Sequence, residues 1–171
     1  MLMEISSTNI KILKFSEYLK ESSEFMTKGN KPNAAGVALL YNNKILLVHP
    51  TGGSWQKGTC GIPKGGIEPG EEPIDAALRE LREETGIILS KDKLDLSPEV
   101  VHIHNKKGTR SLIYFVCRIS DLSEIGLTSE KIPNSMLQPE EIDWSKFVDA
   151  DSAYPIMCSS QLLILDRHLL K

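Results

Sequence analysis

The segment from Pro73 to Gly86, "PIDAALRELREETG", constrains the fold of this chain more than any other. It predicts a helix, because proline suits a first helical turn and glycine suits the left-handed stop residue. At about 100° per residue, one side of this helix is an apolar stripe. The members of the stripe are Ile74, Leu78 and Leu81. A helix with one apolar side has to pack that side against another element, so the chain must build a core around it.

The same helix carries three glutamates where its electrostatics disfavour them. Glu80, Glu83 and Glu84 lie close to the carbonyl end, which has partial negative charge. Glu80 and Glu84 are also four residues apart, where like charges repel. The three carboxylates share an arc of about 100°, and Arg79 lies beside Glu83, able to orient a carboxylate. Stability alone does not select this arrangement, so we expect positive charge to bind there.

The chemistry of the donors narrows the choice of cation. Carboxylate oxygens with no histidine or cysteine beside them favour Mg²⁺ or Mn²⁺ over zinc. Magnesium held by few protein carboxylates completes its shell with water and substrate phosphates. We therefore expect divalent ions that carry a phosphate-bearing ligand. The alternative is a solvated charged face without function.

The remaining elements predict an α+β fold. Apolar and β-branched runs predict strands at residues 34–41, 44–50, 60–62, 99–105 and 111–119. Asn42-Asn43 suits a tight hairpin, because asparagine tolerates positive φ angles. Helical spacing is present at residues 10–25, and a helix at 159–170 can be capped by Ser159 or Ser160. Residues 120–140 are irregular. Since strands and helices mix without strict alternation, we predict a sheet flanked by helices.

Composition bounds the organisation and the compartment. A length of 171 residues predicts one domain, at 31–171, preceded by an N-terminal extension and linker at 1–30. Three cysteines without a C-x-x-C pair indicate a reducing, cytoplasmic setting rather than disulfides or zinc. A formal net charge of −3 gives no indication of a general nucleic-acid surface. The apolar runs are too short to span a bilayer, and no secretion signal is evident, so no membrane partner is expected.

The run "GGIEPGEEPIDAALRELREETGI" resembles the signature of the Nudix hydrolases. All seven fixed residues and both apolar positions of the signature match. They are Gly65, Glu71, Arg79, Glu80, Leu81, Glu83, Glu84, Gly86 and Ile87. A looser similarity covers residues 34–170. The resemblance implies an α/β/α sandwich with a mixed β-sheet, and hydrolysis of a nucleoside diphosphate linked to another group.

The resemblance also implies roles for single residues. The three glutamates of the helix would hold the metal ions, with Gly65 contributing to the metal site and Arg79 to catalysis. One of the glutamates, or another from a later loop, would take a proton from water. Lys64 is placed to contact phosphate, and Gly65 lets the backbone approach the phosphates closely. Glu141, or its neighbour Glu140, lies in "QPEEIDW", where many members carry a further acidic residue.

The substrate is less closely constrained. The "PKG" form of the signature resembles that of diadenosine tetraphosphate hydrolases and of diphosphoinositol polyphosphate phosphohydrolases, which predicts a polyphosphate substrate such as a (di)nucleoside polyphosphate. The residues 56–61 add length before "IPKG", a departure from those proteins. The alternatives are an RNA 5′ end, a nucleotide sugar or a nucleoside triphosphate, or a module that only binds nucleotides, which the intact glutamates disfavour. Trp55 and Tyr114 are either packing residues or a surface on which a base stacks.

The extension has a second interpretation. "LKFSEYLKE", which ends at Glu21, resembles the leader of proteins packaged in the heads of large tailed phages, cut after Leu-x-Glu. An ordinary flanking helix is the alternative. The sequence leaves the oligomeric state open.

Overall fold

The computed structural model describes residues 9–13, 32–56, 58–95 and 97–170. The strands are β1 (Asn9–Leu13), β2 (Ala34–Tyr41), β3 (Lys44–Pro50), β4 (Lys64–Gly66), β5 (Glu99–Asn105), β6 (Gly108–Ile119) and β7 (Ile142–Asp149). The α-helices are α2 (Pro73–Thr85), α3 (Ala150–Ala153) and α4 (Leu162–His168). Short 3₁₀ turns lie at Lys91–Lys93, Leu122–Ile125, Asn134–Met136 and Ser159–Gln161. None of the helices among these residues has the length and apolar character that crossing a bilayer requires.

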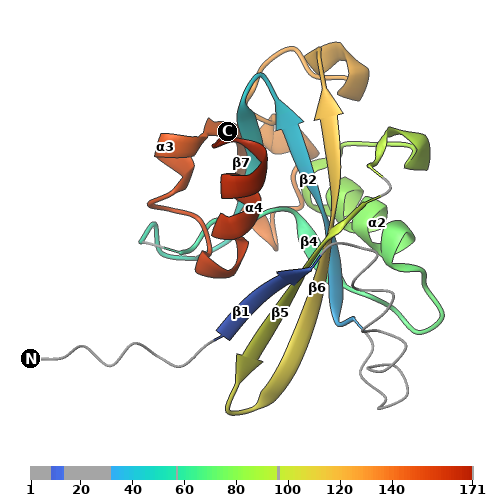
Figure 1. The fold of residues 1–171 in the computed structure, drawn as a ribbon. Coiled ribbons are helices and arrows are strands. Elements are labelled where there is room, and N and C mark those ends of the chain that lie inside the picture. Colours follow the sequence, from blue (N-terminus) through green and yellow to red (C-terminus); the bar gives the residue numbers. More distant parts are fainter. Residues whose placement is uncertain (1–8, 14–31, 57, 96, 171) are drawn as a thin grey trace, which may run out of the picture.

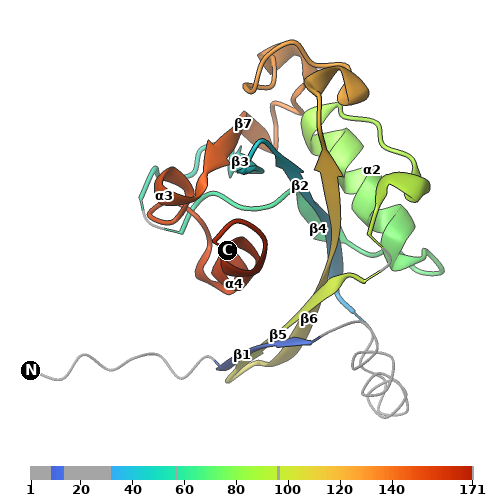
Figure 2. The same cartoon turned by 45° about the horizontal axis from the view of Figure 1, so that its top comes forward.

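The strands form one mixed sheet between two helical layers. The order is β1-β5-β6-β2-β3-β7, with β2 and β6 parallel and the other neighbouring pairs antiparallel. Figure 2 shows α2 on one face, with α3 and α4 on the other. Residues alternate between these faces, so Val37 and Leu39 of β2 pack in the core under α2, while Ala38 and Leu40 pack toward α4. The prediction of an α+β sandwich is confirmed.

A fork between β2 and β3 carries the segment that meets α2. The two strands pair only beside their hairpin, at Leu40–Ile45 and Tyr41–Lys44. The start of β2 pairs instead with β4, while Gly61 forms a bridge with Val48 of β3. Residues 61–66 therefore fill the opening between the strands. This arrangement places β4 against α2, and Figure 1 shows the two elements side by side.

Several local predictions are confirmed and others are wrong. Asn42 and Asn43 have φ angles of 46° and 57°, and Gly86 ends α2 with a φ of 70°. The strand predicted at 60–62 is reduced to isolated bridges, because the pairing with β2 begins only at Lys64. The last helix begins at Leu162 after a 3₁₀ turn, and no side chain caps either element. β7 and α3 follow the irregular segment without having been predicted.

The first described residues form a strand rather than the predicted helix. Residues Asn9–Leu13 pair with β5 in antiparallel register, from Asn9 opposite His104 to Leu13 opposite Val100. The five residues "NIKIL" alternate polar and apolar at the start, which also satisfies the two-residue period of a strand. Pairing with an edge strand satisfies the backbone and outweighs the weak helical spacing. The rest of the predicted helix, and the leader-like site at Glu21, lie outside the described residues.

Candidate active site

The acidic end of α2 faces β4 across a contact that requires glycine. Ala76, Ala77 and Leu81 bury the opposite side of the helix in the core. A Cβ atom at Gly65 would overlap the carboxylate of Glu80, so only glycine lets this side chain lie against the backbone of β4. One turn later, Glu84 Oε2 accepts a hydrogen bond from the Lys64 backbone N–H at 3.2 Å. The site is thus built by one helical turn and one short strand.

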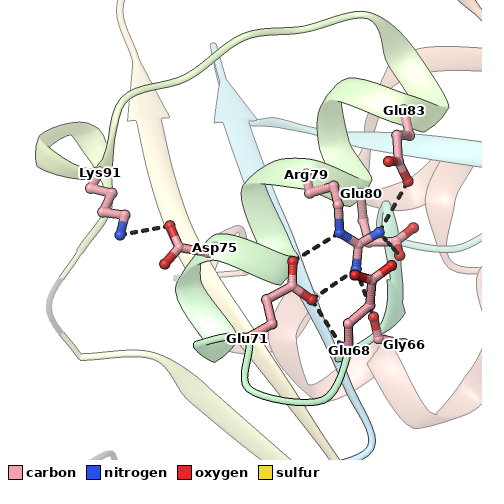
Figure 3. A network of polar contacts seen from close by, with 8 residues as sticks. All are labelled: Gly66, Glu68, Glu71, Asp75, Arg79, Glu80, Glu83 and Lys91. Atoms are coloured by element: carbon pink, nitrogen blue, oxygen red, sulfur yellow. Dashed lines mark hydrogen bonds and ion pairs between the residues drawn. The ribbon is translucent and has the colours of Figure 1, made fainter.

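Arg79 joins the carboxylates into a network (Figure 3). Its Nη1 donates to Glu80 Oε1 at 2.7 Å and to Glu83 Oε2 at 3.0 Å. Its Nε and Nη2 donate to both oxygens of Glu71, at 2.9 and 3.0 Å, and Nη2 also reaches the Gly66 carbonyl at 2.8 Å. The hydrogen bonds from Arg79 lower the pKa of Glu71. The predicted orienting role of Arg79 agrees with this geometry, and Figure 3 shows that the other ion pair drawn, Lys91 with Asp75, lies apart from it.

Burial makes two glutamates of α2, Glu80 and Glu84, difficult to ionise. It raises the pKa of Glu80, and it raises the pKa of Glu84 to about 8. The negative charge of Glu141 raises both pKa values further, whereas the Lys64 ammonium lowers that of Glu84. Glu141 and Lys64 therefore lie within electrostatic reach of the glutamates. The carboxyl groups of Glu71, Glu80, Glu83 and Glu84 outnumber the two cations beside them, Arg79 and Lys64.

The residues fit a hard divalent cation. Within the described part of the chain, no three His, Cys, Asp or Glu side chains are grouped closely enough to hold a metal ion, and Arg79 pairs with Glu71, Glu80 and Glu83. The donor atoms nevertheless suit such a cation, because all three glutamates offer carboxylate oxygens. Glu80 and Glu84 have raised pKa values, and Glu83 lies at the exposed rim. A cation there would favour their ionised forms.

The two predicted aromatic residues have different environments. Tyr114 is fully buried in the core on the α4 side, and its hydroxyl accepts a hydrogen bond from Gln161 Nε2 at 2.9 Å. It is a packing residue, and its assignment to substrate binding is corrected, because no base can stack on a ring enclosed by the core. Trp55 is 56% exposed, so its ring is accessible to a base.

Gln161 is a site-supporting residue that the sequence analysis did not identify. Its side chain is buried, and Oε1 accepts a hydrogen bond from the Ile62 N–H at 2.8 Å while Nε2 donates to Tyr114. It thereby fixes the backbone two residues before Lys64. A lone amide in the apolar run "SSQLLIL" could have been recognised as a buried hydrogen-bonding group, but its partner could not.

We expect Gln161→Met to displace this backbone. The substitution keeps the length of the side chain and leaves the buried Ile62 N–H without an acceptor, which costs about 1–3 kcal/mol of unfolding free energy. The unfolding free energy, measured with denaturant, and kcat should both fall, because the displaced backbone leads directly to Lys64 and Gly65. Tyr114→Phe, the matched control, removes only the other hydrogen bond and should affect kcat less. Equal effects on kcat would contradict the role assigned to the Ile62 contact.

Known proteins are similar to this chain in sequence and in fold. A model of the NUDIX domain matches residues 30–159. The asymmetrical bis(5′-nucleosyl)-tetraphosphatase of Mus musculus is 37% identical over 71 residues, which cover 40% of this chain and 48% of that protein. An RNA pyrophosphohydrolase of Sulfurovum sp. is 32% identical over 121 residues, covering 62% of this chain and 73% of that protein. The structure of a C. elegans Ap4A hydrolase binary complex shares the fold, with a TM-score of 0.57 and 20% identity over 80% of this chain and 94% of that one.

Coverage differs among these proteins, and the chain spans only 35%, 46% and 52% of the length of three further relatives that it matches. The family model nevertheless extends over most of the chain, from before β2 into the turn that precedes α4. The sandwich and the geometry of the signature residues agree with that match. The chain therefore belongs to the Nudix family.

Proposed function

We propose that this chain hydrolyses a phosphoric anhydride bond in a nucleoside diphosphate linked to another group, in a reaction that depends on Mg²⁺ or Mn²⁺. The observation that carries the proposal is a pair of glutamates held against the backbone of β4, the half-buried Glu80 and the buried Glu84. One buried and one half-buried carboxylate, both of raised pKa, are a costly arrangement for a helix end. They are useful when a cation and a phosphate chain bind between them and the solvent.

The residues of the chain have separable tasks in this reaction. Glu80, Glu83 and Glu84 would hold the ion, and Arg79 keeps Glu80 and Glu83 oriented. A bound divalent ion neutralises phosphate charge and lowers the pKa of a coordinated water. In the hydrolysis, a water oxygen would bond to phosphorus while the anhydride P–O bond breaks with its electron pair on the leaving phosphate, and a carboxylate of the chain would accept the water proton. Lys64 lies beside Glu84, where its ammonium can contact phosphate.

A dinucleoside polyphosphate is the substrate class that we favour. The mouse relative and the C. elegans structure are both named for hydrolysis of such compounds. In the "PKG" segment, Pro63 to Gly65, Lys64 places a cation beside the carboxylates, and Gly65 has no side chain to cover the backbone there. Both features suit a ligand with several linked phosphates.

An RNA 5′ end is the second candidate. The Sulfurovum relative, which this chain matches over 121 residues, is named as an RNA pyrophosphohydrolase. The two candidates share the bond that breaks and differ in what is attached to it. The same carboxylates would therefore act in either reaction.

A substrate panel with and without metal tests this function. We expect the purified chain with Mg²⁺ or Mn²⁺ to release nucleotide products from diadenosine polyphosphates faster than from nucleotide sugars, nucleoside triphosphates or 5′-triphosphorylated RNA. Excess chelator should remove the activity, and added Mg²⁺ should restore it. Turnover that survives the chelator would contradict the metal site, and a preference for the RNA would favour the second candidate.

A further inference from the structure

An exposed indole ring lies on an aromatic support beyond the end of β3. The ring of Trp55 stacks on His49 with centroids 3.8 Å apart and planes 2° apart, and it meets the ring of Trp144 edge-on at 5.3 Å. More than half of Trp55 nevertheless remains exposed. Because His49 covers one face of the indole, the accessible part lies on the other face and its edges. We call these three residues, Trp55, His49 and Trp144, the aromatic platform.

The support beneath Trp55 is fixed by polar contacts. The His49 ring is completely buried, and its Nδ1 is 2.6 Å from Asp143 Oδ1 of β7. The other ring nitrogen faces the carbonyl of Ser54, the residue before Trp55, at 3.4 Å. A histidine held from both sides cannot turn freely, so the ring stacked on it is held too. A surface that is ordered before it binds a ligand loses less entropy on binding.

The platform adjoins β7 on one side and, through β3, the segment that leads to the carboxylates on the other. Thr51, which follows β3, donates its N–H to the Glu141 carbonyl at 2.8 Å and its hydroxyl to the Pro139 carbonyl at 2.8 Å. Val48, the residue before His49, forms a bridge with Gly61, three residues before the Lys64 whose N–H donates to Glu84. Asp143, two residues after Glu141, holds the platform. A ligand that contacts both the carboxylates and the platform would have an anionic chain near the carboxylates and a flat ring near Trp55.

We propose that the exposed face of Trp55 binds a nucleobase of the substrate by stacking. This inference rests on the proposed function and adds to it, because it assigns recognition of the base to the aromatic platform and selects nucleotides over polyphosphates that lack a base. Base–aromatic stacking tolerates different bases, since every base has a π face. The platform therefore distinguishes ligands with and without a base more strongly than one base from another. His49 and Asp143 are positioning residues, which act through Trp55.

Fluorescence tests the platform without reference to catalysis. The chain has two tryptophans, so Trp144→Phe leaves Trp55 as the only indole. We expect AMP to quench this emission in a saturable manner, because stacking brings the base onto the ring. Ribose 5-phosphate, which has the same phosphate but no base, is the matched ligand and should not quench it. Equal responses to AMP and ribose 5-phosphate would overturn the proposal.

Kinetics give an independent measurement on the full chain. With a diadenosine polyphosphate, Trp55→Ala should raise KM about 10- to 100-fold and change kcat little, because the platform contributes binding rather than chemistry. Trp55→Phe keeps a ring and should raise KM less. Thermal melts of both variants provide the structural control. A parental KM in Trp55→Ala, or a loss confined to kcat and thermal stability, would contradict base binding.

Failure of the proposed function and failure of base binding by Trp55 would give different results. If the parent hydrolyses no nucleotide in the presence of metal, the proposed function is wrong, whereas the AMP titration still decides whether Trp55 binds a base. If the parent is active and Trp55→Ala retains its KM, the function stands and the platform does not. AMP-specific quenching together with a raised KM supports both.

Discussion

Glu84→Gln is expected to lower kcat by roughly 100-fold or more and, in the absence of metal, to stabilise the folded protein at pH 8. The loss of activity follows from removing a carboxylate that would hold the cation or accept the proton. The gain in stability follows from burial, which raises the pKa of Glu84 to about 8 from the ordinary 4.5. The glutamine amide has no charge to bury, and its oxygen can still accept from the Lys64 N–H.

The sign of the pH dependence follows from proton binding. Between about pH 4.5 and 8, the folded metal-free chain retains a proton on Glu84 that the unfolded chain releases. This contribution to stability is complete below pH 4.5 and is lost as the pH rises through 8. The raised pKa of Glu80 acts in the same direction. The unfolding free energy of the parent should therefore fall toward pH 8, by on the order of 1 kcal/mol per pH unit, and that of Glu84→Gln should fall less.

Denaturant titrations at pH 5 and pH 8, in chelator, measure this difference. Glu72→Gln is the matched control, because it removes one negative charge from an exposed position at the other end of α2, where acidic residues are favoured. It should cost a few tenths of a kcal/mol and leave the rate unchanged. Saturating Mg²⁺ should stabilise the parent more than Glu84→Gln. Parental rates in Glu84→Gln would refute the assignment of this helix end as the catalytic site.

Gly65→Ala is expected to remove most of the activity while the fold persists. The added methyl group would occupy the position of the Glu80 carboxylate. That carboxylate is the end of a flexible side chain, so it can swing away at low cost, and the unfolding free energy should change by about 1 kcal/mol or less. Once displaced, Glu80 loses its hydrogen bond from Arg79 and its place in the site. We expect a decrease in kcat of roughly 100-fold.

Gly66→Ala provides a control in the next residue. A Cβ atom there meets nothing within 4 Å, so both the rate and the unfolding free energy should stay close to those of the parent. Comparison of the two alanine variants separates the loss of one contact from any general effect on β4. If both variants were equally active, the contact between Gly65 and Glu80 would have no catalytic importance.

The sequence predicted the parts of this molecule that depend on local chemistry. Pro73 and Gly86 set the ends of α2, Asn42 and Asn43 set the hairpin, and the spacing of the glutamates placed them together. Contacts between segments that are distant in the sequence could not be predicted from local patterns. The enclosure of Tyr114 depends on α4, and the contact of Gln161 with Ile62 joins residues 99 positions apart.

The same limit explains the error at the N-terminus and the role of Trp55. In "NIKIL", helical and extended patterns compete, and the free edge of β5 decides between them. For Trp55, the sequence left packing and base binding equal. The ring contacts with His49 and Trp144 combine with its exposure to support the second, but they become visible only when β3 and β7 lie side by side.

Two isolated bridges separate the loop at residues 51–59 from the catalytic segment that begins at Lys64. Cys60 is fixed to Met157, and Gly61 is fixed to Val48, so the chain is anchored on two sides before it reaches Lys64. We therefore expect changes of length or composition between Thr51 and Thr59 to be absorbed ahead of these anchors, with little shift of the catalytic residues. The molecule is modular in this respect: an engineer could exchange the loop to change the choice of ligand while leaving the hydrolytic machinery intact.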